Sequence, residues 1–227
     1  MKKKRNPNHI EGLITREAPK SVISEIYRTI RTNIDFSMID EKLNSLVITS
    51  SHANEGKTTT ASNLAITFAQ TEKKVLLIDA DLRRPTLHNQ FKLQNQKGLT
   101  NVIAKQESFE KAVVPSGTEN LWILPSGPIP PNPAELLGSN SMAELLKEAL
   151  AHFDLVIFDM PPLLAVTDAQ ILGRLCDGVL LVVRSHQTKK EDLIKAKDLL
   201  DKAQVRIIGS ILHGVDSSNS NQYYYYG

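Results

Sequence analysis

Short apolar runs alternate with segments of helical spacing along most of the chain. The apolar runs, which predict strands, span residues 46–50, 75–80, 121–125, 155–159, 179–184 and 207–212. The segments with helical spacing span residues 21–37, 58–70, 139–151, 167–175 and 189–203. Several runs have at least four consecutive apolar residues, as expected for strands whose two faces are both covered by helices. The alternation therefore predicts an α/β fold with a doubly wound, mostly parallel sheet and helices on both faces.

The chain divides into three segments by composition. Residues 1–20 are polar and contain two prolines, which predicts a mobile N-terminal arm. Residues 21–216 carry the alternating pattern and have the size of one domain. Residues 217–227 lack aliphatic side chains, which predicts a flexible tail rich in tyrosine.

Overall charge and cysteine content narrow the class of protein. The chain has 27 Lys and Arg residues against 25 Asp and Glu residues, a net charge of +2, so charge gives no reason to expect a nucleic-acid partner. The single cysteine, Cys176, excludes an internal disulfide and suits a reducing compartment. The sequence shows no apolar stretch of about 20 residues. We therefore expect a cytoplasmic protein that reaches a membrane only through a partner.

A polar loop between the first strand and the second helical segment carries the clearest chemical signal. It reads Ser-His-Ala-Asn-Glu-Gly-Lys-Thr over residues 51–58, a variant of the phosphate-binding loop in which Ser51 replaces the first glycine. Backbone N–H groups and the helix dipole would hold phosphates there. Asn54 takes a position that is often glycine, and asparagine tolerates the left-handed backbone. The predicted ATP-binding residues are Asn54, Glu55, Gly56, Lys57, Thr58 and Thr59, with Lys57 at the β- and γ-phosphates and Thr58 at Mg²⁺.

Three aspartates stand at or just beyond the ends of two apolar runs. Asp79 and Asp81 close the second run, and Asp159 closes the fourth. A parallel sheet brings these strand ends to the edge that carries the phosphate-binding loop. Mg²⁺ prefers such hard oxygen ligands, and an attacking hydroxyl needs a proton acceptor. The alternative is that each aspartate only begins a loop or caps a helix.

These segments resemble those of the bacterial tyrosine kinases of the capsule and exopolysaccharide systems. The resemblance rests on Gly-Lys-Thr at 56–58, Ile-Asp-Ala-Asp-Leu-Arg-Arg-Pro at 78–85, Phe-Asp-Met-Pro-Pro at 158–162 and the proline-rich segment 127–137. It implies a P-loop NTPase fold similar to the MinD and ParA proteins and a Mg–ATP-dependent protein-tyrosine kinase activity. It also implies that Asp79 and Lys57 are catalytic, with Asp79 as the base for the tyrosine proton. Thr58, Asp81 and Asp159 would hold Mg²⁺, and Arg83 and Arg84 either contact phosphate or are simply exposed.

The same resemblance assigns roles to the tail and to the first helix. Tyr223, Tyr224, Tyr225 and Tyr226 would be autophosphorylation sites, although such a run also suits an adhesive segment. Glu25, Arg28 and Arg31 match a Glu-x-x-Arg-x-x-Arg motif that joins subunits in the family, although its spacing alone suits an ordinary salt-bridged helix. The motif implies a ring-shaped homo-oligomer, an octamer, in which one subunit's tail enters the next subunit's site in trans. The predicted helix carries Ile23, Ile26, Ile30 and Ile34 on one face, with Ser21 or Ser24 as its cap.

The resemblance also implies partners. These are a transmembrane activator that acts through its cytosolic tail, protein substrates of polysaccharide synthesis, and a cognate tyrosine phosphatase. The chain would be recruited by the activator to the inner face of the cell membrane.

Two other functions fit parts of the sequence. A positioning or partitioning ATPase shares the fold and the Asp-x-Asp segment, but its usual extra lysine would fall at His52. A nucleotide-binding scaffold without transfer activity is the third possibility, suggested by Asn54 and Met160, which depart from the family pattern. His213 is another departure, at a position after the last strand where relatives offer an asparagine to adenine.

Overall fold

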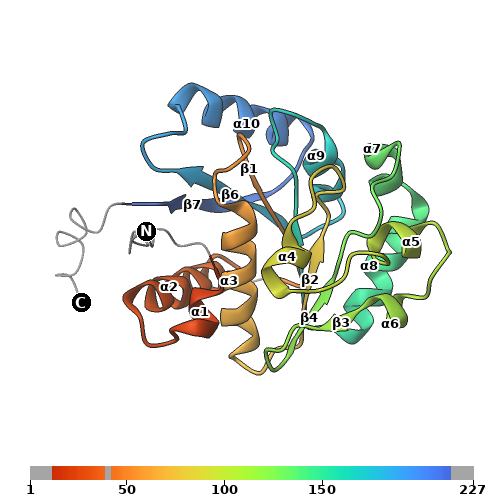
Figure 1. Ribbon diagram of the computed structural model, residues 1–227. Helices are drawn as coiled ribbons and strands as arrows, with labels where there is room; N and C mark the ends of the chain where they lie inside the picture. The colour runs from red at the N-terminus through yellow and green to blue at the C-terminus, as the bar shows by residue number, and fades with distance from the viewer. Residues whose placement is uncertain (1–11, 39–41, 216–227) are drawn as a thin grey trace, which may run out of the picture.

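One mostly parallel sheet organises the molecule. The computed structural model describes residues 12–38 and 42–215 (Figure 1). Seven strands are hydrogen-bonded in the order β3-β4-β2-β5-β1-β6-β7. Their bounds are β1 Ser45–Ser50, β2 Val75–Asp79, β3 Val114–Pro115, β4 Leu121–Leu124, β5 Leu155–Asp159, β6 Gly178–Arg184 and β7 Ile207–His213. All neighbours run parallel except β3, which pairs antiparallel with β4. The predicted α/β fold is confirmed.

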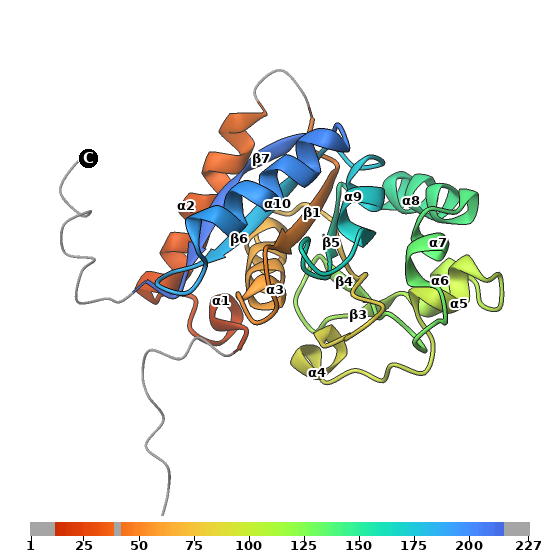
Figure 2. The ribbon, with the colours of Figure 1, turned by 90° about the horizontal axis from the view of Figure 1, so that it is seen from above.

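Helices cover both faces of this sheet. They are α1 Ile14–Glu17, α2 Val22–Ser37, α3 Lys57–Ala69, α4 Leu87–Phe91, α5 Leu99–Ile103, α6 Phe109–Ala112, α7 Pro133–Leu137, α8 Asn140–His152, α9 Asp168–Gly173 and α10 Lys190–Lys202. Figure 1 shows α10 above β6 and β7 and α2 below them. Helices α5–α8 gather at the β3–β4 end of the sheet, away from α2 and α10 (Figure 2). The sheet is therefore held by helices from both sides. The loops of the site described below lie at the edge formed by the carboxyl ends of its strands.

Alternate side chains of each strand enter two separate hydrophobic cores. Leu76 and Ile78 of β2 pack with helices α5, α6 and α8–α10. Val75 and Leu77 of the same strand pack with α2, α3 and α4. This alternation follows from the two-residue repeat of a strand, and it explains why these strands are apolar on both faces.

The length of an element decided whether the sequence revealed it. Each predicted strand agrees with an observed strand within one residue at either end, and the predicted helices agree within two. The pattern missed β3 and the helices α1 and α4–α7, which are five residues or shorter. Such pieces are too short to show a period. Within the described residues, no helix is both long and apolar enough to cross a membrane.

Residues 12–20 depart from the expected mobile arm. Leu13 is 1% exposed and Thr15 is fully buried. The Thr15 amide and hydroxyl both donate to Asn63 Oδ1 at 2.9 Å, and Asn63 Nδ2 donates to the Gly12 carbonyl at 3.0 Å. This part of the arm is thus packed on α3. The hydrophobic pattern did not reveal it, because one apolar side chain, Leu13, and a few polar contacts leave little periodic signal. Residues 1–11 lie outside the described part of the chain.

Helix α2 begins as predicted, but its buried face differs from the predicted one at Ile26 and Tyr27. The Ser21 hydroxyl accepts the Ser24 amide at 3.2 Å, which confirms Ser21 as the cap. Tyr27 and Ile34 are 5% and 4% exposed, whereas Ile26 is 45% exposed. The expectation that Ile26 belongs to the buried face is therefore wrong. Tyr27 takes the central position because its ring packs beside Thr60 of α3, and burial raises the pKa of its phenol to about 12.

Candidate active site

The loop between β1 and α3 has the backbone that a phosphate-binding loop requires. Asn54 has a φ of 65°, as its tolerance of the left-handed region predicts, and Gly56 has a φ of 94° immediately before the first residue of α3. A Cβ atom on Gly56 would lie 2.5 Å from the His213 ring. Only glycine fits this position, because both the φ angle and the close imidazole exclude a side chain. The thirteen-residue helix α3 starts at Lys57 and directs its N-terminal amides to the loop.

Glu55 holds this loop from behind. Its side chain is buried, and its carboxylate accepts the His52 amide at 3.0 Å and the Thr188 hydroxyl. Thr188 lies between β6 and α10 and also accepts the Arg184 amide at 2.8 Å. Glu55 does not line the cavity described below. Glu55 was predicted to bind ATP. Its side chain instead fixes the conformation of the loop, because it bonds His52 and Thr188 and does not face the cavity.

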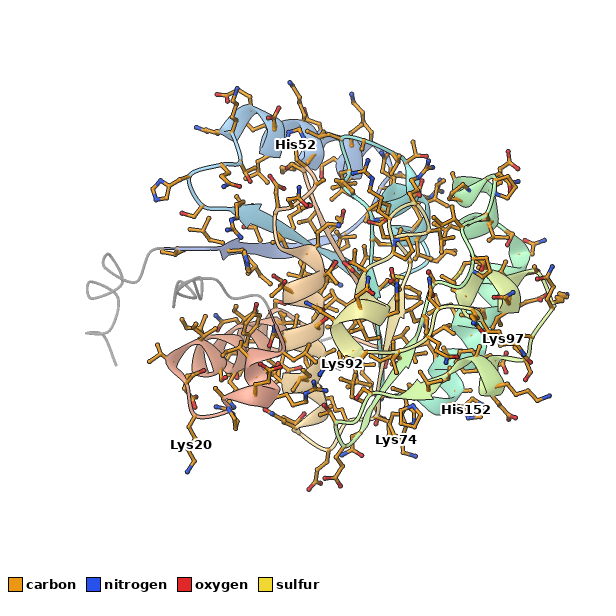
Figure 3. All side chains as sticks on the ribbon, viewed as in Figure 1. Lys20, His52, Lys74, Lys92, Lys97 and His152 are labelled. Atoms are coloured by element: carbon orange, nitrogen blue, oxygen red, sulfur yellow. The ribbon has the colours of Figure 1, made fainter. Side chains whose placement is uncertain are left out.

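His52 makes a second link between the loop and α10. Its Nε2 lies 3.1 Å from Asp192 Oδ2, and Figure 3 shows the labelled His52 beside α10. The phosphate-binding loop is therefore tied to the β6–α10 connection at two points.

The three predicted aspartates meet at the carboxyl ends of β2 and β5. Asp79 and Asp159 are paired neighbours in the sheet register, and both are fully buried, while Asp81 is 6% exposed. Asp79 Oδ2 accepts the Leu87 amide at 3.0 Å. Among the described residues, Asp79 Oδ1 and both Asp159 oxygens have no hydrogen-bond partner. Buried carboxylate oxygens left without partners are costly, so their placement indicates a ligand.

Burial and mutual repulsion perturb two of these carboxyl groups. Burial, and secondly the nearby Asp159, hold the pKa of Asp79 well above its usual value, against the Leu87 hydrogen bond. Burial raises the pKa of Asp159 to about 6, although the Lys57 charge and the Thr58 hydroxyl oppose the rise. Both groups would favour a cation nearby, because a positive charge stabilises their ionised forms.

Lys57 points its ammonium group to this acidic edge. Its Nζ lies 3.5 Å from Asp81 Oδ2, and both side chains are largely buried. The Thr58 hydroxyl lies 3.3 Å from that of Thr86, which follows β2. The structure thus brings together Lys57, Thr58, Asp79, Asp81 and Asp159 as the sequence predicted.

A cavity of about 850 Å³ opens over the loop and the acidic edge. The phosphate-binding loop forms its floor. Residues after β2 and β5 line one half, and residues at the ends of β6 and β7 line the other. Its walls comprise Ala53, Asn54, Gly56, Lys57, Thr58, Thr59, Asp81, Arg83, Arg84, Thr86, Pro161, Pro162, Ala165, Val166, Arg184, Gln187, His213 and Gly214.

Sequence reasoning missed several residues that line this cavity and one residue beside it. Arg184 and Gln187 carried no motif, and Asp168 was not singled out. Asp168 is fully buried and binds Arg83 at two points, with Arg83 Nε 2.9 Å from Oδ2 and Nη2 3.0 Å from Oδ1. The two contacts hold the partly exposed Arg83 side chain in place, whereas Arg84 lines the same cavity without such a clamp.

The predicted oligomerisation residues lie on α2, away from this cavity. Arg28 pairs with Glu25 and donates to the Pro19 carbonyl at 2.8 Å. Arg31 instead donates to the Thr67 carbonyl of α3 at 2.8 Å. One of the three charges therefore serves the fold of its own subunit. The predicted acceptors at 223–226 lie outside the described residues.

Comparisons with known proteins match this chain to one domain family and to proteins named as tyrosine kinases. The family described as AAA domain matches residues 44–207. Tyrosine-protein kinase YwqD of Bacillus subtilis (strain 168) is 52% identical over 227 residues, which span all of this chain and 96% of that protein. The putative tyrosine-protein kinase CapB of Staphylococcus aureus is 41% identical over 96% of either chain.

Solved structures with similar folds include a chimerical protein named CapA2B2 and a MinD protein. The chimerical protein CapA2B2 superimposes with a TM-score of 0.88 and 37% identity, over 94% of this chain and 92% of that one. The septum site-determining protein MinD of Pyrococcus horikoshii OT3, solved with Mg-ADP, gives a TM-score of 0.63 and 25% identity over 74% of this chain and 69% of its own. The expected likeness to the MinD fold is confirmed.

Proposed function

Because the chain belongs to the family of bacterial tyrosine-protein kinases of the capsule and exopolysaccharide type, we propose that its 850 Å³ cavity binds Mg–ATP and transfers the γ-phosphoryl group to tyrosine. This assignment is supported by Lys57 and Asp81, which line that cavity, and by Asp79 and Asp159, which lie buried at the same edge of the sheet. The alternative ATPase switch shares the fold, but the relatives matched over their whole length are named as kinases.

The donor set fits Mg²⁺. The unpartnered oxygens of Asp159, the Asp81 carboxylate and the Thr58 hydroxyl are hard oxygen ligands. Among the described residues, no three carboxylate, imidazole or thiol side chains surround one point. This agrees with a nucleotide-site Mg²⁺, which takes only one or two carboxylates and completes its shell with water and phosphates. When bound, the ion neutralises charge on the phosphates.

Protein side chains carry the remaining steps of transfer. Lys57 exchanges its contact with Asp81 for the β- and γ-phosphates and holds the charge of the transferring group. The tyrosine oxygen forms a bond to the γ-phosphorus while the bond from that phosphorus to the β–γ bridging oxygen breaks, and ADP leaves. Asp79 receives the phenol proton. Burial raises the pKa of Asp79, which makes its carboxylate a stronger base than an exposed one. Nearby cations favour the ionised form, in which the carboxylate can accept the proton.

The C-terminal tyrosines are the acceptors that we propose for this transfer. Gly214 lines the cavity, and Tyr223 is nine residues further along the chain. At about 3.4 Å per residue, an extended chain of this length reaches roughly 30 Å. The tail is thus tethered at the mouth of a site that requires a phenol.

We propose that subunits form a ring of eight and that phosphorylation occurs in trans. Helix α2 presents the exposed Glu25–Arg28 pair to solvent. It also exposes three apolar residues, Val22, Ile26 and Phe36, at 60%, 45% and 66%. Exposed apolar side chains on one helix, next to a charged pair, suit a contact between subunits.

Activation and recruitment require a partner. The similar chimera is named CapA2B2, and we propose that this chain likewise pairs with the cytosolic tail of a transmembrane activator at the inner face of the cell membrane. Further partners in this proposal are protein substrates of polysaccharide synthesis and a cognate tyrosine phosphatase.

A single assay tests the proposed activity. The purified chain is incubated with Mg–ATP, with and without a candidate activator tail, and phosphotyrosine is mapped by mass spectrometry. We expect phosphate on Tyr223–Tyr226, increased by the activator. Lys57→Met should remove it while the circular-dichroism spectrum stays unchanged, because Lys57 faces a ligand site. Unchanged phosphorylation in Lys57→Met would move the activity to another site.

A further inference from the structure

We propose that Arg83, clamped by Asp168, binds the phosphate of a phosphotyrosine adjacent to the acceptor tyrosine. The kinase would then prefer an acceptor segment that already carries one phosphate. This inference rests on the proposed transfer in the same cavity, and it adds a substrate preference to it.

The order of the strands assigns the two halves of the cavity. β2 and β5 lie on one side of β1, and β6 and β7 lie on the other. Lys57, which begins α3 after β1, directs its ammonium to Asp81, 3.5 Å away at the end of β2. Because Lys57 serves the β- and γ-phosphates, the γ-phosphate belongs to the β2–β5 half. The acceptor must therefore enter between the segments that follow β2 and β5.

Arg83 stands in that half and joins its two walls. It follows β2, and Asp168 is the first residue of α9, which follows β5. The guanidinium binds the buried carboxylate through Nε and Nη2 at 2.9 and 3.0 Å. The Arg83 side chain is 39% exposed and lines the cavity. Its Nη1 has no hydrogen-bond partner among the described residues, so the clamp fixes the guanidinium and leaves donors available.

The charges of the site create a need for this cation. Asp81 lines the cavity, and Asp79 and Asp159 lie buried at the same edge of the sheet, toward which the acceptor hydroxyl must point. A phosphotyrosine carries nearly two negative charges, and a neighbour in a tyrosine run is only about 3.4 Å away along the backbone. Without a compensating cation, the carboxylates would repel a tail that has already been phosphorylated once. A preorganised guanidinium matches a phosphate in geometry as well as in charge.

Two matched peptides measure the preference. Both have the sequence of residues 217–227 with Tyr224 as the only acceptor and Phe at 223 and 226, and they carry either Phe or phosphotyrosine at 225. The enzyme is the full chain with Phe at 223–226, so that it does not label itself. We expect kcat/KM for the phosphorylated peptide to be about tenfold higher, the size of a charge-assisted hydrogen bond.

Variants connect this ratio to the clamp. Arg83→Gln should bring the ratio to about one or below, and Arg83→Lys should restore part of it, because lysine keeps the charge and loses the planar fork. Asp168→Asn should also lower the ratio, since the guanidinium loses its ionic anchor. Arg84→Gln is the control and should keep the ratio, because Arg84 is not bound to Asp168. If Asp168→Asn fails to fold, the Arg83 variants decide.

Binding provides a measurement that needs no transfer. Two further peptides are compared by fluorescence anisotropy with Mg–ADP present. One has phosphotyrosine at 225 and Phe at 223, 224 and 226, and the other has Phe at all four positions. The phosphorylated peptide should bind more tightly, and Arg83→Gln should abolish the difference. Equal kcat/KM values for the two acceptor peptides, or an equal loss for both in Arg83→Gln, would overturn the subsite. Arg83 would then only join the segments that follow β2 and β5. If the wild-type site phosphorylates neither peptide, the proposed function fails, and the binding difference still decides the subsite.

Discussion

At the scale of single residues, the site concentrates groups that are unfavourable for folding alone. Asp79 and Asp159 are fully buried neighbours, and three of their four oxygens lack partners within the described structure. Uncompensated buried carboxylates destabilise a fold. Such an arrangement is typical of functional sites, where stability is sacrificed for binding or chemistry.

Asp79→Asn separates binding from transfer. The amide keeps the size of the side chain and an oxygen that accepts the Leu87 amide, but it does not take a proton. We expect nucleotide affinity to change little and phosphotransfer to fall by about 10²–10⁴, the usual contribution of a general base. Single-turnover assays and nucleotide titration measure the two effects. Near-normal turnover would assign the base role to another group.

His213→Asn tests a pH effect beside the phosphate-binding loop. Burial, and secondly the Arg184 charge, lower the pKa of His213 below its usual 6.5. A lowered folded-state pKa contributes stability above the unfolded value, and this contribution is lost as pH falls through the folded value. From pH 7.5 to pH 5, the wild-type melting temperature should therefore fall more than that of His213→Asn. Parallel melting curves across this range would show that the imidazole does not contribute.

At the scale of elements, α2 is joined to the helix that carries the nucleotide loop. Arg31 binds the Thr67 carbonyl of α3, and Tyr27 packs beside Thr60, one turn after Lys57. The Glu25–Arg28 pair makes no such contact with α3. Within the motif, Arg31 thus holds α2 on α3, whereas Glu25 and Arg28 are the candidates for a contact with another subunit.

If the proposed ring is joined through α2, double replacement of Glu25 and Arg28 by Ala should convert it to monomers. The melting temperature should change little, because exposed ion pairs contribute little stability. Asp35→Ala, which removes another exposed charge of the same helix by breaking its ion pair with Lys73, is the control and should leave the proposed ring intact. Arg31→Ala should instead lower the melting temperature. Light scattering gives the mass, and an unchanged mass in the double variant would contradict an interface at this pair.

At the scale of the whole molecule, the last strand ends at the cavity, and the proposed acceptor tyrosines follow it in the sequence. β7 ends at His213, and both His213 and Gly214 line the cavity. The chain beyond Val215 thus starts at the cavity itself. A segment that starts there is compatible with transfer within one subunit as well as with the proposed transfer between subunits.

Mixing two chains distinguishes the routes. A Lys57→Met chain with its natural tail is combined with an active chain in which Tyr223–Tyr226 are Phe. Transfer in trans should label the inactive chain on its tail, whereas transfer within a subunit should label neither. Mass spectrometry locates the phosphate. Label outside residues 223–226 would contradict the tail as the main acceptor.

The sequence by itself determined the longer elements and the gathering of the predicted aspartates at one edge of the sheet. Continuous apolar runs specify strands buried on both faces, and parallel strands necessarily bring Asp79, Asp81 and Asp159 to the edge of the phosphate-binding loop. These inferences succeeded because each depends on a local pattern and on the direction of the chain.

Tertiary structure alone decided the contacts that hold the site in shape. Arg83 meets Asp168 across 85 residues, Thr188 meets Glu55 across 133, and Thr15 meets Asn63 across 48. No local period marks these pairs, because each depends on how separate elements pack and on which polar groups are thereby buried together. The short helices and the packed part of the N-terminal segment belong to the same class: their stability comes from distant partners and leaves little trace in the sequence.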